Sequence, residues 1–310
     1  MKTSTNIPRG CILGIFILSM VSPSLMCQMK SGGEQISDTT AMIKESWFTV
    51  RRIADKVWRI DDHGGDNMYL VEGNEKALLI DAGTGMADLA GCVKSITSLP
   101  VMVVNTHGHP DHCGNDFQYR EVYAHPKDFG KIEYFCNEKY LDDAVEGIVK
   151  KSPELAPLLL NDRGNFTFPV LLPVEEGYIF DLGKKKIEVI EVQGHTEGSI
   201  CLLDLEDKLL FTGDNNNTIV WLFLDGCLPL ESYLRTLEKV QSRSKAFTLL
   251  LPGHGEPLDN EFIGEQIVCA RNILSGECTG EPYRTFVGGA MICYYKRAGI
   301  AFDPNNLHGK

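Results

Sequence analysis

The chain has 310 residues, 43% hydrophobic and 23% charged, which is the composition of a soluble globular protein with one large domain or two small ones. Acidic residues outnumber basic residues by 42 to 30, so the formal net charge is -12 at pH 7. A field of this sign repels polyanions, which counts against nucleic acid as a partner or a substrate.

The first predicted element is an export signal over residues 1–27. Basic residues precede an apolar run from Cys11 to Val21, and small and turn-forming residues follow it. The run is shorter than the about 20 apolar residues of a membrane-spanning helix, although an uncleaved anchor remains an alternative. Cys27 could carry a lipid after cleavage, but Met26 stands where a small residue would be expected. We expect an exported protein, either periplasmic, secreted or attached to a membrane only through its N-terminus.

A linker is predicted over residues 28–41, where polar and small residues lack apolar periodicity, and a folded domain over 42–310. Within the domain, short apolar runs predict strands at Tyr69–Val71, Ala77–Ile80, Val101–Val104, Ile187–Val192, Ile200–Leu203, Leu209–Phe211, Phe247–Leu251, Ala290–Tyr295 and Gly299–Phe302. Longer runs predict helices at Met86–Ser95, Lys127–Lys150, Leu230–Ser242 and Glu261–Leu274. This alternation indicates a layered α/β domain. The basic run Lys184–Lys186 reads as a solvated hairpin turn.

Five predicted strands run into a histidine or an aspartate at the same end. These residues are Asp81, His107, His195, Asp214 and His254. A glycine directly precedes three of them, and glycine permits unusual backbone angles and close approach. Loops that converge over one edge of a rigid sheet are what a metal coordination shell requires.

The segment from His107 to His112 has the spacing of a metal-binding loop. On an extended segment His107 and His109 point the same way, so both imidazoles can bind one ion. Pro110 then turns the chain, which leaves Asp111 and His112 to face a second ion. The spacing differs from that of a helical HExxH site.

Three later residues complete two metal sites. His195 can supply the third nitrogen to the first ion, His254 can join the second, and Asp214 can bridge both. This set of nitrogen and carboxylate ligands, without cysteine, favours two Zn²⁺ ions, although Fe or Mn could occupy a similar set.

These residues resemble the metallo-β-lactamase superfamily. Its HxHxDH motif stands here at His107–His112, GHT at Gly194–Thr196, GD at Gly213–Asp214 and PGHG at Pro252–Gly255. The resemblance covers about Ile43 to Pro257. It implies a four-layer αβ/βα sandwich with the metal site at its edge, and it makes Asp81 a residue that supports the ligand loops from behind.

Three residues differ from the usual family pattern, and they indicate which branch of the superfamily the chain resembles. Asp214 stands where the lactamases proper usually have Cys or Ser, and His109 replaces the Glu of the diiron flavoprotein branch. Gln193 replaces a frequent Pro, which affects a local turn. The resemblance therefore favours the glyoxalase II-like and lactonase-like branches. The chain lacks the long basic helical domain of glyoxalase II, which weakens that exact assignment.

The predicted function is that of a metal-dependent hydrolase for a small-molecule ester, thioester or lactone. A hydroxide held by two zinc ions would attack the carbonyl, and Asp111 would shuttle the proton. A β-lactamase-type amide hydrolase and a phosphodiesterase of the same fold are the alternatives, and a non-catalytic metal-binding protein is a third.

Substrate contacts are expected outside the ligand set. His63 lies in a polar turn that in the family often overhangs the site, and Asn215 and Trp221 follow the bridging aspartate. A helical insertion near residues 127–165 is predicted to cap the metal cleft and to set specificity.

Overall fold

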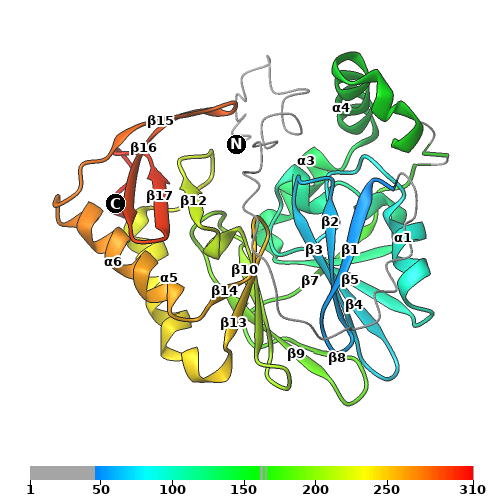
Figure 1. The fold of residues 1–310 in the computed structure, drawn as a ribbon, viewed down its shortest axis with the longest axis horizontal. Coiled ribbons are helices and arrows are strands. Elements are labelled where there is room, and N and C mark those ends of the chain that lie inside the picture. The colour runs from blue at the N-terminus through cyan, green and yellow to red at the C-terminus, as the bar shows by residue number, and fades with distance from the viewer. Residues whose placement is uncertain (1–45, 161–162, 165, 310) are drawn as a thin grey trace, which may run out of the picture.

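The computed structural model describes residues 46–160, 163–164 and 166–309. The predicted signal, the linker and Cys27 lie outside the described residues. No helix of the described part is both long and apolar enough to cross a bilayer. Three sheets and the helices around them form the folded domain (Figure 1).

The first sheet holds seven strands that are neighbours in chain order: β1 (Phe48–Ala54), β2 (Val57–Asp62), β3 (Asn67–Glu72), β4 (Ala77–Ile80), β5 (Val101–Val104), β6 (Glu121–Ala124) and β7 (Val170–Pro173). The second sheet has the order β14 (Leu258–Asp259), β13 (Leu249–Pro252), β11 (Leu209–Gly213), β10 (Ile200–Asp204), β9 (Lys186–Glu191) and β8 (Ile179–Asp181). Strands β4, β5, β6 and β7 pair in parallel, and so do β11 and β13. Their carboxyl ends therefore meet at common edges of the two sheets.

The helices are α1 (Leu89–Ile96), α2 (Pro110–Cys113), α3 (Phe129–Phe135), α4 (Glu138–Lys151), α5 (Leu230–Ser242) and α6 (Phe262–Leu274). Short 3₁₀ turns are η1 (Asp116–Gln118), η2 (Pro126–Asp128), η3 (Pro153–Leu158), η4 (Asp214–Asn216) and η5 (Ser244–Ala246).

Three apolar clusters define the layers. One lies between the two large sheets and joins residues such as Tyr69 of β3 to Phe211 of β11. A second packs α1 and α4 against the outer side of the first sheet. The third packs α5 and α6 against the second sheet. From left to right in Figure 1, the order is helices, sheet, sheet, helices, which confirms the predicted four-layer αβ/βα sandwich.

A third, four-stranded sheet extends the α5–α6 side. Its order is β12 (Ile219–Leu222), β17 (Ala298–Phe302), β16 (Gly288–Tyr295) and β15 (Glu281–Thr285). A disulfide between Cys278 and Cys293 ties the segment after α6 to β16. The two strands predicted near the C-terminus belong to this sheet as β16 and β17.

The predicted helix at Lys127–Lys150 is divided in the structure. Helix α3 ends at Phe135, and the side chain of Asn137 accepts a hydrogen bond from Tyr140 N at 3.0 Å to start α4. An asparagine at this position satisfies a free backbone N–H of the first turn, so it begins a new helix. Similarly, α1 starts at Leu89, three residues later than predicted, because Asp88 caps Gly91 N.

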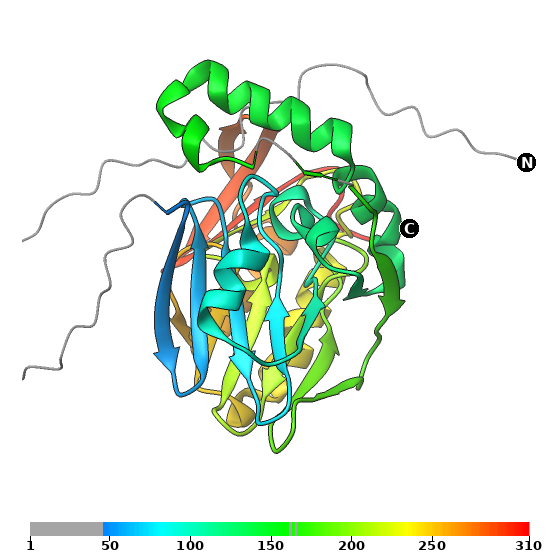
Figure 2. The same cartoon turned by 90° about the vertical axis from the view of Figure 1, so that its right-hand side faces the viewer.

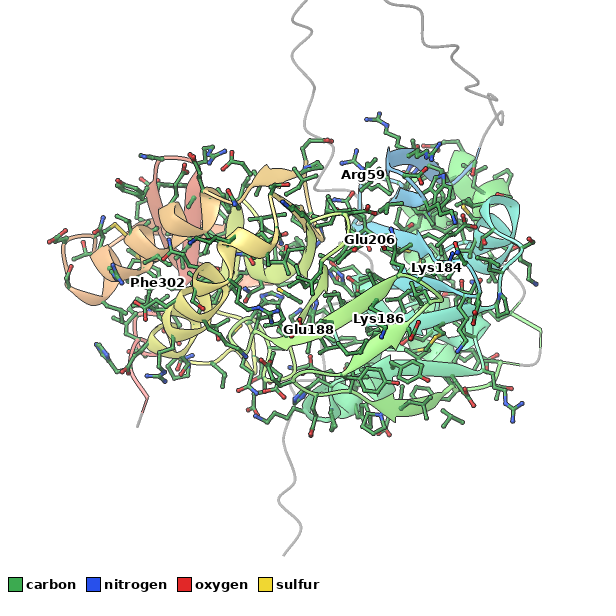
Figure 3. All side chains as sticks on the ribbon, turned by 90° about the horizontal axis from the view of Figure 1, so that it is seen from below. Arg59, Lys184, Lys186, Glu188, Glu206 and Phe302 are labelled. Carbon is green, nitrogen blue, oxygen red and sulfur yellow. A yellow bond between two sulfur atoms is a disulfide. The ribbon has the colours of Figure 1, made fainter. Side chains whose placement is uncertain are left out.

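The basic run between β8 and β9 is only partly solvated. Lys184 and Lys186 are exposed at the turn (Figure 3). Lys185, by contrast, is 8% exposed and forms ion pairs with Asp204 and Asp207. The expectation of a wholly solvated turn was therefore wrong for the middle lysine, whose partners are the last residue of β10 and a residue of the turn after it.

Candidate metal centre

The seven predicted ligands lie on loops at strand ends. The chain leaves β5 at Val104, bends at Thr106 and His107 and is extended at His109, and Pro110 then begins the one-turn helix α2. Strand β11 ends directly before Asp214, and β13 ends two residues before His254. The loops bring together three overlapping groups of three, in each of which the ligand atoms lie within 4.8 Å of one another: His107, His109 and His195; His107, His112 and Asp214; Asp111, His112 and His254.

Three imidazoles form the first ligand group. His109 Nδ1 lies 3.1 Å from His107 Nε2 and 2.9 Å from His195 Nε2. Zinc–nitrogen bonds of about 2.0–2.1 Å in tetrahedral geometry separate ligand atoms by about 3.3 Å. The three nitrogens are therefore spaced as ligands of one small cation.

The second group combines a carboxylate with two imidazoles. His254 Nε2 lies 3.3 Å from Asp111 Oδ2, and His112 Nε2 lies 3.8 Å from the same oxygen. Helix α2 makes this possible, because Asp111 and His112 both leave its single turn toward the interior. Asp111 is 7% exposed and His112 is fully buried.

Asp214 stands between the two groups. Its Oδ1 lies 3.3 Å from Nε2 of both His112 and His254, and its Oδ2 lies 3.5 Å from His195 Nε2. Each carboxylate oxygen thus faces a different ligand group, which is the arrangement of a bridging ligand.

Two buried atoms of the cluster lack a hydrogen-bond partner among the described residues. They are His112 Nε2 and Asp214 Oδ1. Unpaired polar atoms cost free energy when they are buried, and a cation between them would satisfy both. The residues therefore fit metal ions, and their nitrogen and oxygen donors suit zinc, iron or manganese.

Burial keeps the first group neutral. Burial lowers the pKa of His107 and His109 well below the usual range, and neighbouring imidazoles lower it further. Burial also lowers the pKa of His195. A neutral imidazole is the form that binds a metal, so this group is ready to coordinate at neutral pH.

In the second ligand group, the neighbouring carboxylates determine the direction in which the pKa of His112 is shifted. Burial opposes a charged imidazole, yet Asp111, Asp81 and Asp214 raise the pKa of His112 well above the usual range. For Asp214, burial opposes the charged form, but His254 and His112 hold its pKa well below the usual value. These electrostatic interactions between carboxylates and imidazoles show that the second ligand group stabilises positive charge.

Asp81 contacts Thr106 in the loop of His107 and the ring of His112, and its supporting role stays a prediction. Its Oδ1 accepts from Thr106 N at 2.7 Å, and its Oδ2 accepts from Thr106 Oγ1 at 2.9 Å. His112 Nδ1 lies 3.0 Å from the same Oδ2. Asp81 therefore fixes the ring orientation of His112, whose other nitrogen faces the cluster. Its backbone φ of 64° is unusual for a non-glycine residue.

Two glycines let the loops approach closely. A Cβ added at Gly253 would lie 2.6 Å from Asp214 Oδ1 and 2.7 Å from the His112 ring. Gly213 has a φ of 47°, and an added Cβ there would lie 2.3 Å from Thr106 Oγ1. Any larger residue would displace Asp214 or His112 at position 253 and Thr106 at position 213.

Two buried asparagines hold the loop of His254, and sequence analysis did not predict this role for either of them. Asn67 at the start of β3 donates through Nδ2 to Gly255 O at 2.8 Å, and its backbone N donates to Gly253 O at 2.7 Å. From the other side, Asn217 Oδ1 accepts from His254 N at 3.1 Å. The ligand loop is thus fixed on both sides of His254.

Asp128 is a further buried residue that sequence analysis did not single out. Its Oδ2 accepts from Gly108 N at 2.9 Å and from Thr196 Oγ1 at 2.5 Å, and its Oδ1 accepts from Gly198 N at 3.2 Å. The carboxylate, which is 0% exposed, therefore joins the loop of His107 and His109 to the loop of His195. No motif marks it, because its partners lie about 20 and 70 residues away in the chain.

We expect Asp128→Asn to weaken binding of one metal ion about 10- to 100-fold, because it disturbs the residue that aligns the first ligand group. Competition with a chromophoric chelator measures this affinity. Asp204→Asn is the matched control, since Asp204 is equally buried but pairs with Lys185 away from the ligand loops. Equal metal affinity in both variants and the parent protein would show that Asp128 does not align the site.

The three predicted substrate contacts occupy different environments. His63 is exposed on the turn between β2 and β3. Its ring stacks on the ring of Trp47, with 4.4 Å between the ring centroids. Trp221 is half-buried, and its carbonyl oxygen lies 2.7 Å from His195 Nδ1. Asn215 is 1% exposed and donates to Asn216, so its burial argues against direct contact. Contact through His63 and Trp221 stays a prediction.

Comparison with known sequences agrees with this geometry. The sequence profile of the metallo-beta-lactamase superfamily matches residues 61–254. An acyl-coenzyme A thioesterase MBLAC2 from Homo sapiens is 27% identical over 230 residues, which cover 67% of this chain and 81% of the relative. Its counterpart from Gallus gallus is 29% identical over 196 residues, 57% and 69% of the two chains. An atrochrysone carboxyl ACP thioesterase, AacuM, from Aspergillus aculeatus is 28% identical over 183 residues, 58% and 47%.

Solved structures agree on the fold. A metallo-beta-lactamase from Pontibacter korlensis superposes with a TM-score of 0.52 at 19% identity, over 73% of this chain and 99% of that one. The crystal structure of VMB-1 gives a TM-score of 0.51 at 18% identity, over 76% and 100%. The profile match spans the predicted ligand motifs from His107 to His254. The chain therefore belongs to the metallo-beta-lactamase superfamily and is a metal-dependent hydrolase.

Proposed function

We propose that the protein is a binuclear zinc hydrolase whose substrates are small acyl thioesters. The observation that carries the binuclear assignment is Asp214, whose two oxygens face the two separate ligand groups. The thioester assignment is supported by the names of the relatives above, which are acyl-coenzyme A and ACP thioesterases. Esters and lactones are the neighbouring substrate classes, because their carbonyl carbon undergoes the same attack.

The chemistry divides between the ions and the side chains. Two bound zinc ions would supply a Lewis acid and would lower the pKa of a water molecule from 15.7 to roughly 7. Asp111 lies at the cluster with Oδ2 beside His254 and is placed to take the proton of the attacking water. The water oxygen bonds to the thioester carbon, the carbon–sulfur bond breaks, and the proton passes to the sulfur. The products are a carboxylic acid and a thiol.

The predicted cap is part of the proposal. Helix α3 lies directly against the ligand loop, since a Cβ added at Gly108 would be 2.8 Å from Lys131 Cβ. Lys131 Nζ also donates to Asp225 O at 3.1 Å, on the loop that follows β12. Residues of the insertion thus stand beside the first ligand group, where they would limit access to it.

A substrate panel tests the function. Purified full-length protein loaded with zinc is assayed with acyl thioesters, esters, lactones, nitrocefin and bis-p-nitrophenyl phosphate at equal concentration. We expect the highest kcat/KM with a thioester and little turnover after chelation. Preferential cleavage of nitrocefin would replace the proposal with amide hydrolysis, and preferential cleavage of the phosphodiester would replace it with phosphoryl chemistry. Zinc binding without any turnover would leave a non-catalytic metal protein.

We further propose that the protein is exported and acts on a small molecule without nucleic acid. The N-terminal pattern of residues 1–27 supports export, and so does the Cys278–Cys293 disulfide, because such bonds persist in oxidising compartments. Any membrane contact would come through the N-terminal signal or a lipid on Cys27. Mass spectrometry of the mature N-terminus after cell fractionation tests this, and an intact cytoplasmic chain would refute it.

A further inference from the structure

Side chains alternate along β12 between the core and a second face. Val220 and Leu222 point into the cluster that packs against α5 and α6. Trp221 stands between them and therefore faces the opposite way, and it is half-buried where its two neighbours are buried. The third sheet thus has one face in the core and one face that is partly open.

Aromatic rings gather around Trp221. Its ring centroid lies 5.4 Å from that of Phe223, 6.0 Å from Phe286 and 6.5 Å from Tyr283. Phe223 also lies 6.5 Å from Tyr283. Tyr283 belongs to β15, and Phe286 lies in the turn between β15 and β16. We call these four residues the aromatic face, and all four are half-buried.

The cross-strand neighbours of two of these rings are small. Trp221 stands opposite Ala301 of β17, and Tyr283 stands opposite Ala290 of β16. Ala301 is fully buried, but the rings themselves are half-buried, so part of their apolar surface stays in contact with solvent. Ring surface of this kind binds apolar ligands when it adjoins a reactive site.

The backbone of Trp221 connects the aromatic face to the candidate metal centre. The carbonyl oxygen of Trp221 lies 2.7 Å from His195 Nδ1, so the residue that carries the central ring also holds a ligand of the first group. Cys227 Sγ joins the same two residues, at 3.0 Å from His195 O and 3.6 Å from Trp221 O. Figures 1 and 2 both place the β15–β16 hairpin and α4 at the same, upper end of the molecule.

We propose that the aromatic face binds the apolar acyl chain of the substrate, while the thioester carbonyl lies at the metal centre. This inference rests on the proposed function and adds the substrate class, namely medium-length or longer acyl chains. An apolar chain fits better than a charged group, because the four contacting side chains carry no charge. The chain would run from the first ligand group along β12 toward the hairpin.

Chain-length selectivity tests the inference. The substrates are S-acyl N-acetylcysteamine thioesters with acyl chains of two, four, six, eight and ten carbons. Each buried methylene is worth about fourfold in binding, since about 0.8 kcal/mol converts to that factor. We expect kcat/KM to rise at least about tenfold from the four-carbon to the ten-carbon chain. Tyr283→Ala and Phe286→Ala each lower the ratio of ten-carbon to two-carbon kcat/KM about tenfold.

The ratio of ten-carbon to two-carbon kcat/KM is the informative quantity, because general damage to the enzyme lowers both kcat/KM values equally. Tyr178→Ala is the matched control, since Tyr178 is a 37%-exposed aromatic residue outside the aromatic face. We leave Trp221 unchanged, because its backbone contacts His195. A ratio unchanged in both variants, or equally reduced in Tyr178→Ala, overturns the inference and leaves thioester hydrolysis standing.

A binding measurement separates this inference from the proposed function. The probe is the non-hydrolysable S-decyl thioether of N-acetylcysteamine, titrated by calorimetry into zinc-loaded protein beside its S-ethyl analogue. We expect the decyl compound to bind at least about tenfold more tightly, and Phe286→Ala to remove most of that difference. If thioesters are not hydrolysed but this pattern is found, the aromatic face stands and the reaction is wrong. Equal affinity for both thioethers overturns the aromatic face whatever the activity.

Discussion

Replacing Asp214 with alanine is expected to lower thioester kcat by at least about 10³-fold, which corresponds to about 4 kcal/mol in the activation free energy. The side chain faces both ligand groups, with oxygens 3.3 Å from His112 and His254 and 3.5 Å from His195. Its loss removes the shared ligand and leaves five imidazoles and one carboxylate to hold two dications. We therefore expect bound zinc to fall below two ions per chain as well.

Steady-state kinetics and elemental analysis of the same preparation measure both effects. Asp181→Ala serves as the control, because Asp181 is an exposed aspartate at the end of β8. Circular dichroism establishes that the Asp214 variant is folded. A folded Asp214→Ala protein with two zinc ions and a kcat within tenfold of the parent would mean that the carboxylate is not a bridging ligand.

Removal of the metal is expected to cost about 4 kcal/mol of unfolding free energy, if free zinc stands at about 1,000 times its dissociation constant. For a domain of this size that corresponds to a Tm lower by roughly 10 °C. The physical reason is local. Without a cation, His112 Nε2 and Asp214 Oδ1 remain buried without a hydrogen bond, although they lie 3.3 Å apart.

Differential scanning calorimetry before and after chelation gives the Tm difference, and re-addition of zinc must restore it. Magnesium at the same concentration is the control, since this hard ion prefers oxygen ligands and binds an imidazole-rich site poorly. A Tm that is unchanged by chelation would show that the fold does not depend on ions at this cluster.

Patterns local in the chain made much of the fold predictable. Strand β4 was predicted with its observed bounds, and so were β5 and α5, because their apolar periodicity is strong and their ends carry turn residues. The short edge strand β14 has only two residues and no such pattern, so its place depends on pairing with β13. The break between α3 and α4 depends on a single capping asparagine inside a helical pattern.

The candidate site likewise contains residues that local sequence patterns predict and residues that only the folded chain reveals. Motif spacing indicated the seven candidate ligands, which follow strand ends in the chain and which the structure brings together. Asp128, by contrast, contributes through hydrogen bonds to two distant loops, and nothing in its local sequence marks it. The aromatic face likewise needs the register of β12 with β17 and of β15 with β16, which only the folded chain supplies.

We propose that seven side chains hold a pair of metal ions. Anomalous diffraction from crystals of the zinc-loaded protein, collected on both sides of the zinc absorption edge, tests it most directly. We predict two peaks about 3.5 to 4 Å apart, one among His107, His109 and His195 and one beside His254, with Asp214 between them. A single peak, or peaks away from these residues, would contradict the binuclear site and the proposed function with it.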